Sequence, residues 1–259
     1  ARPYARYRYL RRRAAEIDHG RQVARMVMHE RPDVLISANA PLDSQRVIQD
    51  ICHEVGTKFI FWMQDAIGLA VKQALSGRFL GVGQLIGDYY AGMERDLARR
   101  SDHLVLISED FLEYIEGGGI DRSRVSIQPN WAPLALTAPL PRHNAWAAAH
   151  SLEDKFVFLF SGVLGLKHEI QPFLALARAF IDTPDVRIVV IAEGPYADEL
   201  RDHVKREGLG NLILLAYQQA DEYPFVLASA DVLLTVLNQE AGRYSVPSKV
   251  YSHMCAGIP

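Results

Sequence analysis

Cysteine is scarce in this sequence of 259 residues, and so are long apolar runs and net charge. Cys52 and Cys255 lie far apart and belong to no CxxC or Cys/His cluster, which favours reduced thiols in a cytoplasmic protein over a disulfide framework. No apolar run approaches the roughly 18–20 residues of a membrane-spanning helix. The net charge of −3 and the isoelectric point near 6.3 argue against a general nucleic-acid-binding protein, because such domains are usually strongly basic.

The composition is typical of a folded, soluble protein: 49% of the residues are hydrophobic and 23% are charged. A basic run opens the chain, with Arg2, Arg6, Arg8, Arg11, Arg12 and Arg13. We interpret this run as the solvated face of a first helix. Peripheral contact with anionic lipid headgroups at the inner membrane face is the alternative, but no apolar stripe accompanies the arginines.

Short apolar runs alternate with longer amphipathic stretches along the chain. The runs predict strands at residues 33–39, 58–63, 103–107 and 124–128, and then at 155–161, 185–192, 211–216 and 231–237. Most are apolar on both faces, as strands between two helix layers are. Helices are expected between them, for instance at 170–181, 197–207, 222–228 and 249–256. This alternation predicts an α/β protein with parallel sheets and right-handed crossovers.

Residues 131–150 separate the two sets of strands. They show neither a helical nor a strand-like hydrophobic period, which indicates a linker. The sequence therefore predicts two Rossmann-like domains, over 1–138 and 151–259, with a linker over 139–150. Ligands of such units bind at the carboxyl ends of the strands, so we expect a site in the cleft between the domains. The chain starts with a basic helix and stops at a helix end, so both domains are expected to be incomplete at the chain termini.

Three loops of the second half contain residues suited to a diphosphate. The first, residues 160–168, follows a predicted strand and contains Gly162, Gly165 and Lys167. Glycines let backbone N–H groups approach an anion closely, and the lysine adds a point charge. An ordinary βα turn with a surface lysine is the alternative at this stage.

The second loop contains Gly194 and Pro195, where a plain turn is an equal explanation. The third loop leads through Ser245 and Val246 to a helix expected to start near Ser248. A helix N-terminus carries partial positive charge and free N–H groups. Lys249 in the first turn opposes this dipole unless an anion is bound nearby, which favours a functional interpretation.

These pieces occur in an order that resembles glycosyltransferase family 4 (GT4), a family of retaining enzymes with the two-domain GT-B fold. The resemblance rests on SEDFLEYI, VSIQPNW, FLFSGVLGLKHEI, IAEGP, LLAYQQADEYPFVLASADVLLTVL and SVPSKVYSHMCAGIP, and it runs from about Pro32 to the last residue. The closest members act in bacterial surface-polysaccharide assembly. Each piece is weak, but the ordered set is specific.

The resemblance implies a metal-independent hexosyltransferase that needs no cofactor. The donor is a nucleotide-diphosphate sugar, and the acceptor is a saccharide or a polyprenyl-linked saccharide at the cytoplasmic membrane face. The implied catalytic residues are Lys167, beside the diphosphate, and Asp65, facing the reacting sugar. The implied donor-binding residues, with Tyr217 and Gln218 against the nucleobase, are Gly162, Gly165, Gly194, Tyr217, Gln218, Ser245, Val246, Ser248 and Lys249. We expect replacement of Lys167 to lower activity more than replacement of Lys249, provided that the Lys249 side chain points away.

The chain departs from the family pattern at its acidic residues. Many relatives carry two glutamates separated by seven residues near the third loop, where this chain has Gly242 and, with a short insertion, Ser252, and where Glu240 is the nearest acid. Glu199 and Glu207 have that spacing, but we interpret them as a solvated helix face. Many relatives also have an arginine after the first loop's glycine, where this chain has Val163.

Other constellations carry little weight. The sequence has no Asp-x-Asp pair and no HExxH spacing. We interpret His168 and His253 as surface residues, with a supporting hydrogen-bond donor behind the site as the alternative for each. Two alternatives to a transferase remain. One is a nucleotide-sugar epimerase of the same fold, which requires general acid/base residues that are not evident here. The other is a non-catalytic nucleotide-sugar-binding partner subunit, which the missing glutamates favour.

Overall fold

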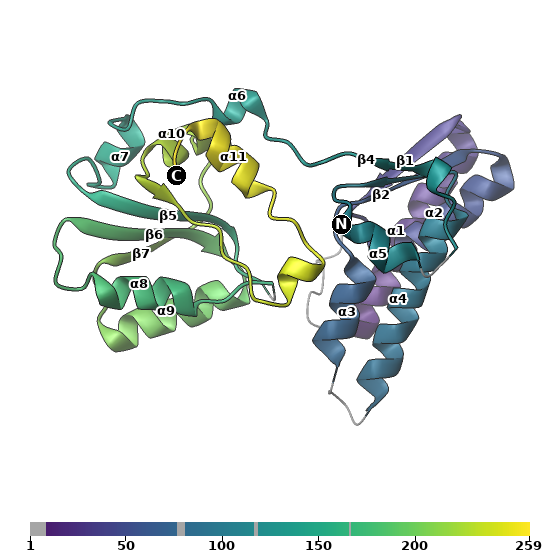
Figure 1. Cartoon of the computed structure of the whole chain (residues 1–259), viewed down its shortest axis with the longest axis horizontal. Helices are drawn as coiled ribbons and strands as arrows, with labels where there is room; N and C mark the ends of the chain where they lie inside the picture. Colours follow the sequence, from purple (N-terminus) through teal and green to yellow (C-terminus); the bar gives the residue numbers. More distant parts are fainter. Residues whose placement is uncertain (1–8, 77–80, 117–118, 166) are drawn as a thin grey trace. The chain divides into compact units, whose positions relative to one another are not determined.

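The structure, a computed structural model, describes residues 9–76, 81–116, 119–165 and 167–259. It divides into two compact units. The first comprises Ala1–Pro129 and Arg243–Val246, and the second comprises Asn130–Gly242 and Pro247–Pro259. Each unit contains a four-stranded parallel sheet with helices packed against it (Figure 1). The predicted fold class, α/β with two Rossmann-like units, is confirmed.

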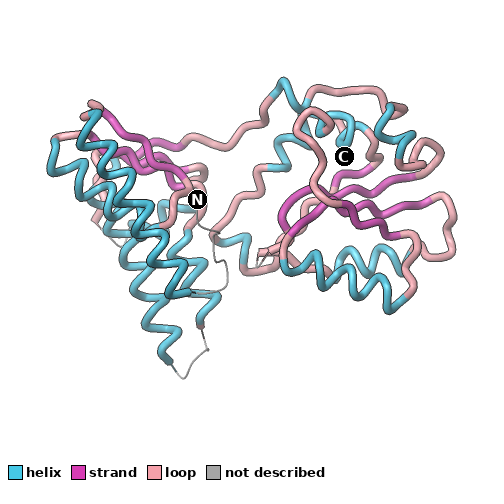
Figure 2. Tube along the Cα trace, turned by 180° about the vertical axis from the view of Figure 1, so that it is seen from behind, coloured by secondary structure: helices cyan, strands magenta, loops and turns pink. Residues whose placement is uncertain are grey.

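The sheet of the first unit has the order β1-β2-β3-β4. Its strands are β1 (Val34–Ala38), β2 (Lys58–Met63), β3 (His103–Leu106) and β4 (Val125–Ile127). Its helices are α1 (Tyr9–Glu30), α2 (Leu42–Val55), α3 (Ile67–Leu75), α4 (Val82–Arg100) and α5 (Asp110–Glu116). Figure 2 shows the long helices of this unit on one side of the sheet. Phe59, Phe61 and Met63 of β2 are buried.

The predicted basic first helix is present as α1, although Arg2, Arg6 and Arg8 lie outside the described residues. The helix packs against α2 through specific polar contacts. Arg13 Nε donates to Asp43 Oδ1 at 3.3 Å, and Ser44 Oγ donates to the Glu16 carbonyl at 2.5 Å. Among the described residues, every helix is too short or too polar to span a bilayer.

The start of α3 is held by an acid from α4. Glu94 is completely buried, and its Oε2 accepts hydrogen bonds from the Gly68 backbone N–H at 2.9 Å and from Tyr114 Oη at 2.8 Å. A helix N-terminus offers free N–H groups and partial positive charge, so a carboxyl there acts as a cap. Burial nevertheless raises the pKa of Glu94 to about 7, against the opposing effect of these hydrogen bonds.

The sheet of the second unit has the order β7-β6-β5-β8. Its strands are β5 (Phe156–Val163), β6 (Val186–Glu193), β7 (Leu212–Leu215) and β8 (Val232–Leu233). The helices are α6 (Leu134–Thr137), α7 (Ala145–Ala149), α8 (Gln171–Ala179), α9 (Pro195–Glu207), α10 (Tyr223–Ala228) and α11 (Lys249–Ala256). Helices α8 and α9 cover one face, and α7, α10 and α11 cover the other (Figure 1).

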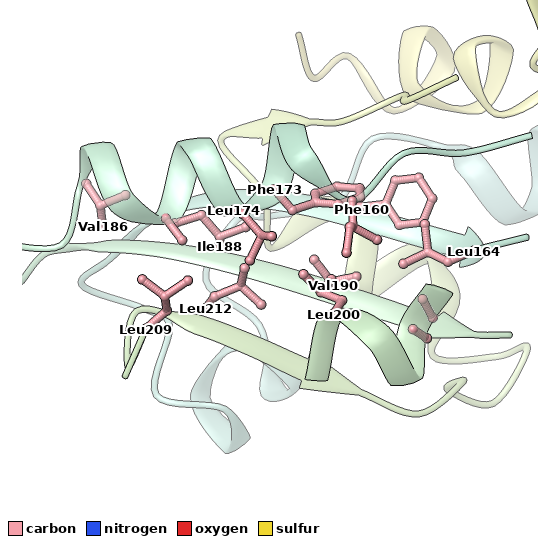
Figure 3. Close-up of a cluster of buried hydrophobic side chains, with 14 residues drawn as sticks. Phe160, Leu164, Phe173, Leu174, Val186, Ile188, Val190, Leu200, Leu209 and Leu212 are labelled. Carbon is pink, nitrogen blue, oxygen red and sulfur yellow. The ribbon is translucent and has the colours of Figure 1, made fainter. Parts of the chain in front are cut away.

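Both faces of this sheet are therefore buried, which explains why its strands are apolar throughout. Phe160, Ile188 and Val190 point toward α8 and α9, where Figure 3 shows them packed with Phe173, Leu174 and Leu200. Leu159, Val189 and Ile191 point to the opposite face and join Trp146 and Leu227 in a second cluster. The central strands β5 and β6 pair over eight residues, from Phe156 opposite Val186 to Val163 opposite Glu193.

The structure differs from the prediction at the linker. The two units divide between Pro129 and Asn130, not at residues 138 and 139. Most of the predicted linker, 139–150, belongs to the second unit: Asn144 caps α7, and Trp146 and Ala147 are buried in its core. Arg142 also binds Asp231 at 3.2 Å. Prolines and a helix of five residues hide this packing from a periodicity analysis.

Candidate functional site

The candidate site lies at the carboxyl end of β5, within the second unit. β5 is an inner strand between β6 and β8, and the loop that leaves it contains Gly162, Gly165 and Lys167. The carboxyl edge of a parallel sheet is where such folds bind ligands. The predicted first loop therefore lies at the edge of the sheet where ligands bind in folds of this class.

Lys249, the first residue of α11, extends its side chain toward this loop. Its Nζ donates a hydrogen bond to the Ser161 carbonyl at 3.1 Å and lies 3.9 Å from the centroid of the Phe160 ring. Burial lowers the pKa of Lys249 to about 8. The condition attached to the smaller expected effect of Lys249, that its side chain points away, is therefore not met, because the amine is directed into the loop.

Gly162 is the residue that permits this approach. Its φ is 151°, and a Cβ added there would lie 2.6 Å from Lys249 Nζ. Any larger residue would displace the amine or strain the backbone. The predicted role of Gly162 is thus coupled to Lys249, a relation that the sequence does not reveal because the two positions lie far apart along the chain.

Gly194 serves a comparable contact within the protein. Its φ is 119°, and a Cβ there would lie 2.6 Å from the Leu164 carbonyl oxygen. That carbonyl accepts a hydrogen bond from the Tyr196 backbone N–H at 3.2 Å. The glycine therefore lets the loop after β6 pack against the loop after β5, which is a structural reason for its presence. Gly165 is less crowded, with Val163 Cγ1 3.7 Å from the position of an added Cβ.

His168 belongs to the same loop, although sequence reasoning placed it on the surface. Its Nδ1 accepts a hydrogen bond from the Gly165 backbone N–H at 3.3 Å, which in the neutral ring leaves the proton on Nε2. Burial and then the charge of Lys249 lower the pKa of His168. Its ring meets the Phe160 ring edge-on, with centroids 6.1 Å apart. His168 is therefore held as a neutral hydrogen-bond donor beside the lysine.

His253, one turn after Lys249 on α11, is also buried. Its Nδ1 lies 3.4 Å from Thr235 Oγ1. Burial and then the charge of Lys249 lower the pKa of His253 to about 4. Its prediction as a surface residue is wrong.

Lys167 is half-buried, and its backbone carbonyl accepts a hydrogen bond from the Asn238 N–H at 2.9 Å. This bond ties the loop after β5 to the segment after β8. The charge of Lys167 contributes to the lowered pKa of His168, but less than that of Lys249. Its catalytic role stays a prediction.

Tyr217 and Gln218, the predicted nucleobase contacts, line a surface hollow of about 310 Å³. Ser161, whose carbonyl binds Lys249, lines the same hollow. Gln218 is fixed by Trp146, whose Nε1 donates to Gln218 Oε1 at 2.9 Å. Tyr217 keeps 43% of its surface exposed. The structure thus brings the predicted base-binding turn next to the lysine and glycine pair.

The remaining predicted residues fall into two groups. Asp65 and Ser245 form an isolated antiparallel bridge within the first unit, where Ala66 N–H donates to the Tyr244 carbonyl at 2.9 Å. Val246 belongs to the same unit. Ser248 immediately precedes α11 in the second unit, and its side chain makes no capping hydrogen bond.

The acidic positions agree with the sequence interpretation. Glu199 and Glu207 are both exposed on α9, and Glu207 pairs with Arg178 at 2.7 Å and with His203 at 3.0 Å. Glu240 and Gly242 are exposed, whereas Ser252 is buried. Among the described residues, the His, Cys, Asp and Glu side chains nowhere gather in a group of three or more that would suit a metal ion.

No family model matches the sequence, and no curated protein matches it. Solved structures do match its fold. HepE from Anabaena in complex with UDP and glucose has a TM-score of 0.71 and 15% identity, covering 93% of this chain and 61% of that chain. The lipopolysaccharide outer core galactosyltransferase WaaB has a TM-score of 0.56 and 18% identity, with coverages of 97% and 61%.

A further match is a Listeria monocytogenes protein to which UDP-N-acetylglucosamine 2-epimerase activity is attributed. Its TM-score is 0.59 and its identity 13%, and the likeness covers 94% of this chain and 60% of that one. The chain thus spans about three fifths of the length of these structures. Likeness at such low identity establishes the architecture and not the activity. The chain has the two-unit α/β fold of the GT-B glycosyltransferases.

Proposed function

We propose that the protein transfers a hexosyl group from a nucleotide-diphosphate sugar to a saccharide or lipid-linked acceptor, with retention of the anomeric configuration. The observation that carries this proposal is the group formed by Lys249, Gly162 and His168 at the carboxyl end of β5. A partly buried ammonium group and a neutral histidine donor beside a glycine loop are suited to an anion.

The chemistry follows from where charge develops. As the bond between the anomeric carbon and the diphosphate oxygen breaks, negative charge builds up on the diphosphate. Donors fixed before the reaction stabilise this charge without reorganisation. Lys249, the loop N–H groups, the first turn of α11 and Lys167 supply these donors in our proposal. The leaving diphosphate then accepts the acceptor's hydroxyl proton, as the GT4 resemblance implies.

The uridine diphosphate sugars are the first donors to test, because HepE has been solved with UDP and with UDP-glucose. The hollow beside Ser161 supports a nucleobase site, since exposed Tyr217 offers a ring and Gln218 offers amide groups there. Asp65 is proposed to face the reacting sugar. We propose that no cofactor and no metal ion takes part.

The acceptor is proposed from weaker support. The likeness to WaaB, a lipopolysaccharide galactosyltransferase, agrees with the sequence resemblance to enzymes of surface-polysaccharide assembly. We therefore propose a saccharide or polyprenyl-linked acceptor presented at the cytoplasmic face of the membrane. The basic residues of α1 support peripheral contact with anionic lipid there.

The test is a donor panel of UDP-, GDP- and ADP-sugars, with and without saccharide acceptors. Acceptor-dependent release of nucleoside diphosphate together with a new glycosidic linkage supports the proposal. Isomerised donor without release identifies an epimerase, the activity that the Listeria likeness keeps in consideration. Binding without either reaction identifies the non-catalytic partner subunit, which the absent glutamates at Gly242 and Ser252 favour. Either of the last two results overturns the proposal.

A further inference from the structure

Lys249 carries a partly buried positive charge for which the protein supplies little compensation. Its ammonium group contacts a carbonyl oxygen, at 3.1 Å, and the face of a phenylalanine ring, at 3.9 Å. Among the residues that the structure describes, no carboxylate lies within ion-pairing distance of it. A charge removed from water is costly unless it is paired. The positive charge of Lys249 is thus not balanced by a negative charge among these residues.

The groups that face Lys249 reinforce this deficit. His168, on the loop after β5, and His253, on α11 itself, both have their pKa lowered by burial and by the charge of Lys249. Both are therefore neutral above pH 7, and neither supplies an anion. Lys167, on the same loop as His168, adds further positive charge. Phe160 and Ser161 of β5 contribute a ring face and a carbonyl.

We propose that Lys249 couples donor binding to proton uptake: a diphosphate bound over Gly162 supplies the missing negative charge and holds the lysine in its protonated form. The inference rests on the proposed function, and it adds that this residue makes the affinity depend on pH. The geometry supports it, because Gly162 leaves the ammonium group 2.6 Å from the position of a Cβ, so no side chain separates the amine from that side of the glycine.

The direction of the effect follows from linkage. In the free protein the Lys249 amine has a pKa of about 8. A bound anion raises this pKa, since an opposite charge favours the protonated form. Binding therefore takes up a proton above about pH 8, and affinity falls about tenfold per pH unit beyond the pKa of the free amine. Below about pH 7 the amine is already protonated in the free protein, so the affinity no longer depends on pH through this group.

The experiment measures UDP binding by titration calorimetry between about pH 7.5 and 9.5, in two buffers of different ionisation enthalpy. Nucleotide phosphate groups are fully ionised in this range, because their last pKa is about 6. For the unmodified protein we expect a loss of affinity of at least tenfold and an uptake that approaches one proton. Lys249→Met should bind more weakly at pH 7.5 and lose both the slope and the proton uptake.

Matched variants separate this lysine from its neighbour and from a general lysine effect. The arginine of Lys249→Arg keeps its charge at every pH tested, so this variant should bind UDP with an affinity that does not change with pH. Lys167→Met should lower affinity but keep the slope. Lys205→Met, at an exposed position of α9, should match the unmodified protein. Circular dichroism melts verify that each variant is folded, and Lys249→Met carries the test if the larger arginine disrupts the loop.

The outcomes distinguish this inference from the proposed function. UDP binding with a flat pH profile, or the same slope in Lys249→Met, overturns the role of Lys249 and leaves the transferase proposal standing. Binding with Lys249-dependent proton uptake but no sugar transfer supports this inference and overturns the transferase. No binding of UDP, ADP, GDP or inorganic pyrophosphate overturns both.

Discussion

Burial shifts the pKa of Glu94 in the first unit and of Lys249 in the second, and these two groups differ in the partners that surround them. Glu94 of the first unit accepts hydrogen bonds from the start of α3 and from Tyr114. Lys249 of the second unit has a carbonyl and a ring for partners. Burial raises the pKa of the acid to about 7 and lowers the pKa of the base to about 8.

The comparison between Glu94 and Lys249 shows how a buried group that only stabilises the fold differs from one that is suited to bind a ligand. Glu94 is completely enclosed, and its donors are fixed parts of one unit, so its role ends with holding α3 to α4. The Lys249 amine lies beside Gly162 at the carboxyl edge of the sheet, where no side chain of that residue covers it. Its partners carry no full negative charge. The donors to Glu94 Oε2 come from the protein, whereas the charge of Lys249 is compensated by an anion in our proposal.

The largest expected effect is on Lys249. In Lys249→Met, kcat/KM for the donor should fall by roughly a hundredfold, because a partly buried charge-assisted hydrogen bond contributes about 1.5–3 kcal/mol and the diphosphate gains charge in the transition state. Steady-state kinetics across a donor series measures this, with Lys205→Met as the matched control. If both variants retain full activity, Lys249 is structural like Glu94, and the comparison fails.

The second effect is on the stability of the first unit. The pKa of Glu94 is raised by folding, so its contribution is complete below about pH 4.5, the ordinary pKa of the group, and is lost as the pH rises toward about 7. The loss is roughly 3 kcal/mol, at about 1.4 kcal/mol per pKa unit. Glu94→Gln should remove this part of the pH dependence of the unfolding free energy.

Urea denaturation of the unmodified protein and of Glu94→Gln at about pH 5 and pH 8 measures the difference between them. Glu199→Gln, at an exposed position of α9, is the matched control and should follow the unmodified protein at both values. The opposite outcome is an equal change in the unfolding free energy of Glu94→Gln and of the unmodified protein between the two pH values. It would show that Glu94 is ionised at both values and that the N-terminus of α3 compensates for its burial.

A smaller effect is expected for Lys167. The charge of Lys167 lowers the pKa of His168 less than the charge of Lys249 does, so we expect its interaction with a diphosphate over Gly162 to be weaker as well. Lys167→Ala should lower kcat/KM by about tenfold, with much of the loss in kcat. Parallel measurement of Lys249→Ala decides the order of the two. A greater loss at Lys167 would restore the sequence-based expectation and assign the main catalytic charge to the loop.

The smallest effect concerns the acidic pair on α9. Replacing both Glu199 and Glu207 with glutamine should leave turnover unchanged, because both are exposed and Glu207 is engaged with Arg178 and His203. Exposed ion pairs contribute about 0–1 kcal/mol, so the variant should also fold. A large loss of kcat would show that this pair supplies the acid missing at Gly242 and Ser252.

Much of the fold follows from local pattern. The apolar runs at 58–63, 185–192 and 211–216 became strands within one or two residues of their predicted bounds, because a run that is apolar on both faces has few alternatives to a central strand. The run at 231–237 shortened to Val232–Leu233, since pairing with β5 ends there. The loops at Gly162, Gly194 and Ser248 were found because glycine and helix starts have local signatures.

The exposure and direction of the site residues were not predictable in the same way. Trp146 is buried because β5, α10 and the turn at Gln218 surround it, and these segments are distant in the sequence. The direction of the Lys249 side chain was left open, and His168 and His253 were expected on the surface. Each expectation failed for the same reason: burial depends on which segments pack together, and the hydrophobic period of one segment does not record this.

The order of strands, the loops that follow them and the types of residue in those loops were therefore present in the sequence, because backbone conformation and amphipathic period are local properties. The contact between Lys249 and Gly162 came from the tertiary structure, which brings the first turn of α11 against the end of β5. The capping of α3 by Glu94 arose in the same way, from the packing of α3 against α4. A pKa shift depends on desolvation and on neighbouring charges, and both are set by which distant segments the fold places side by side.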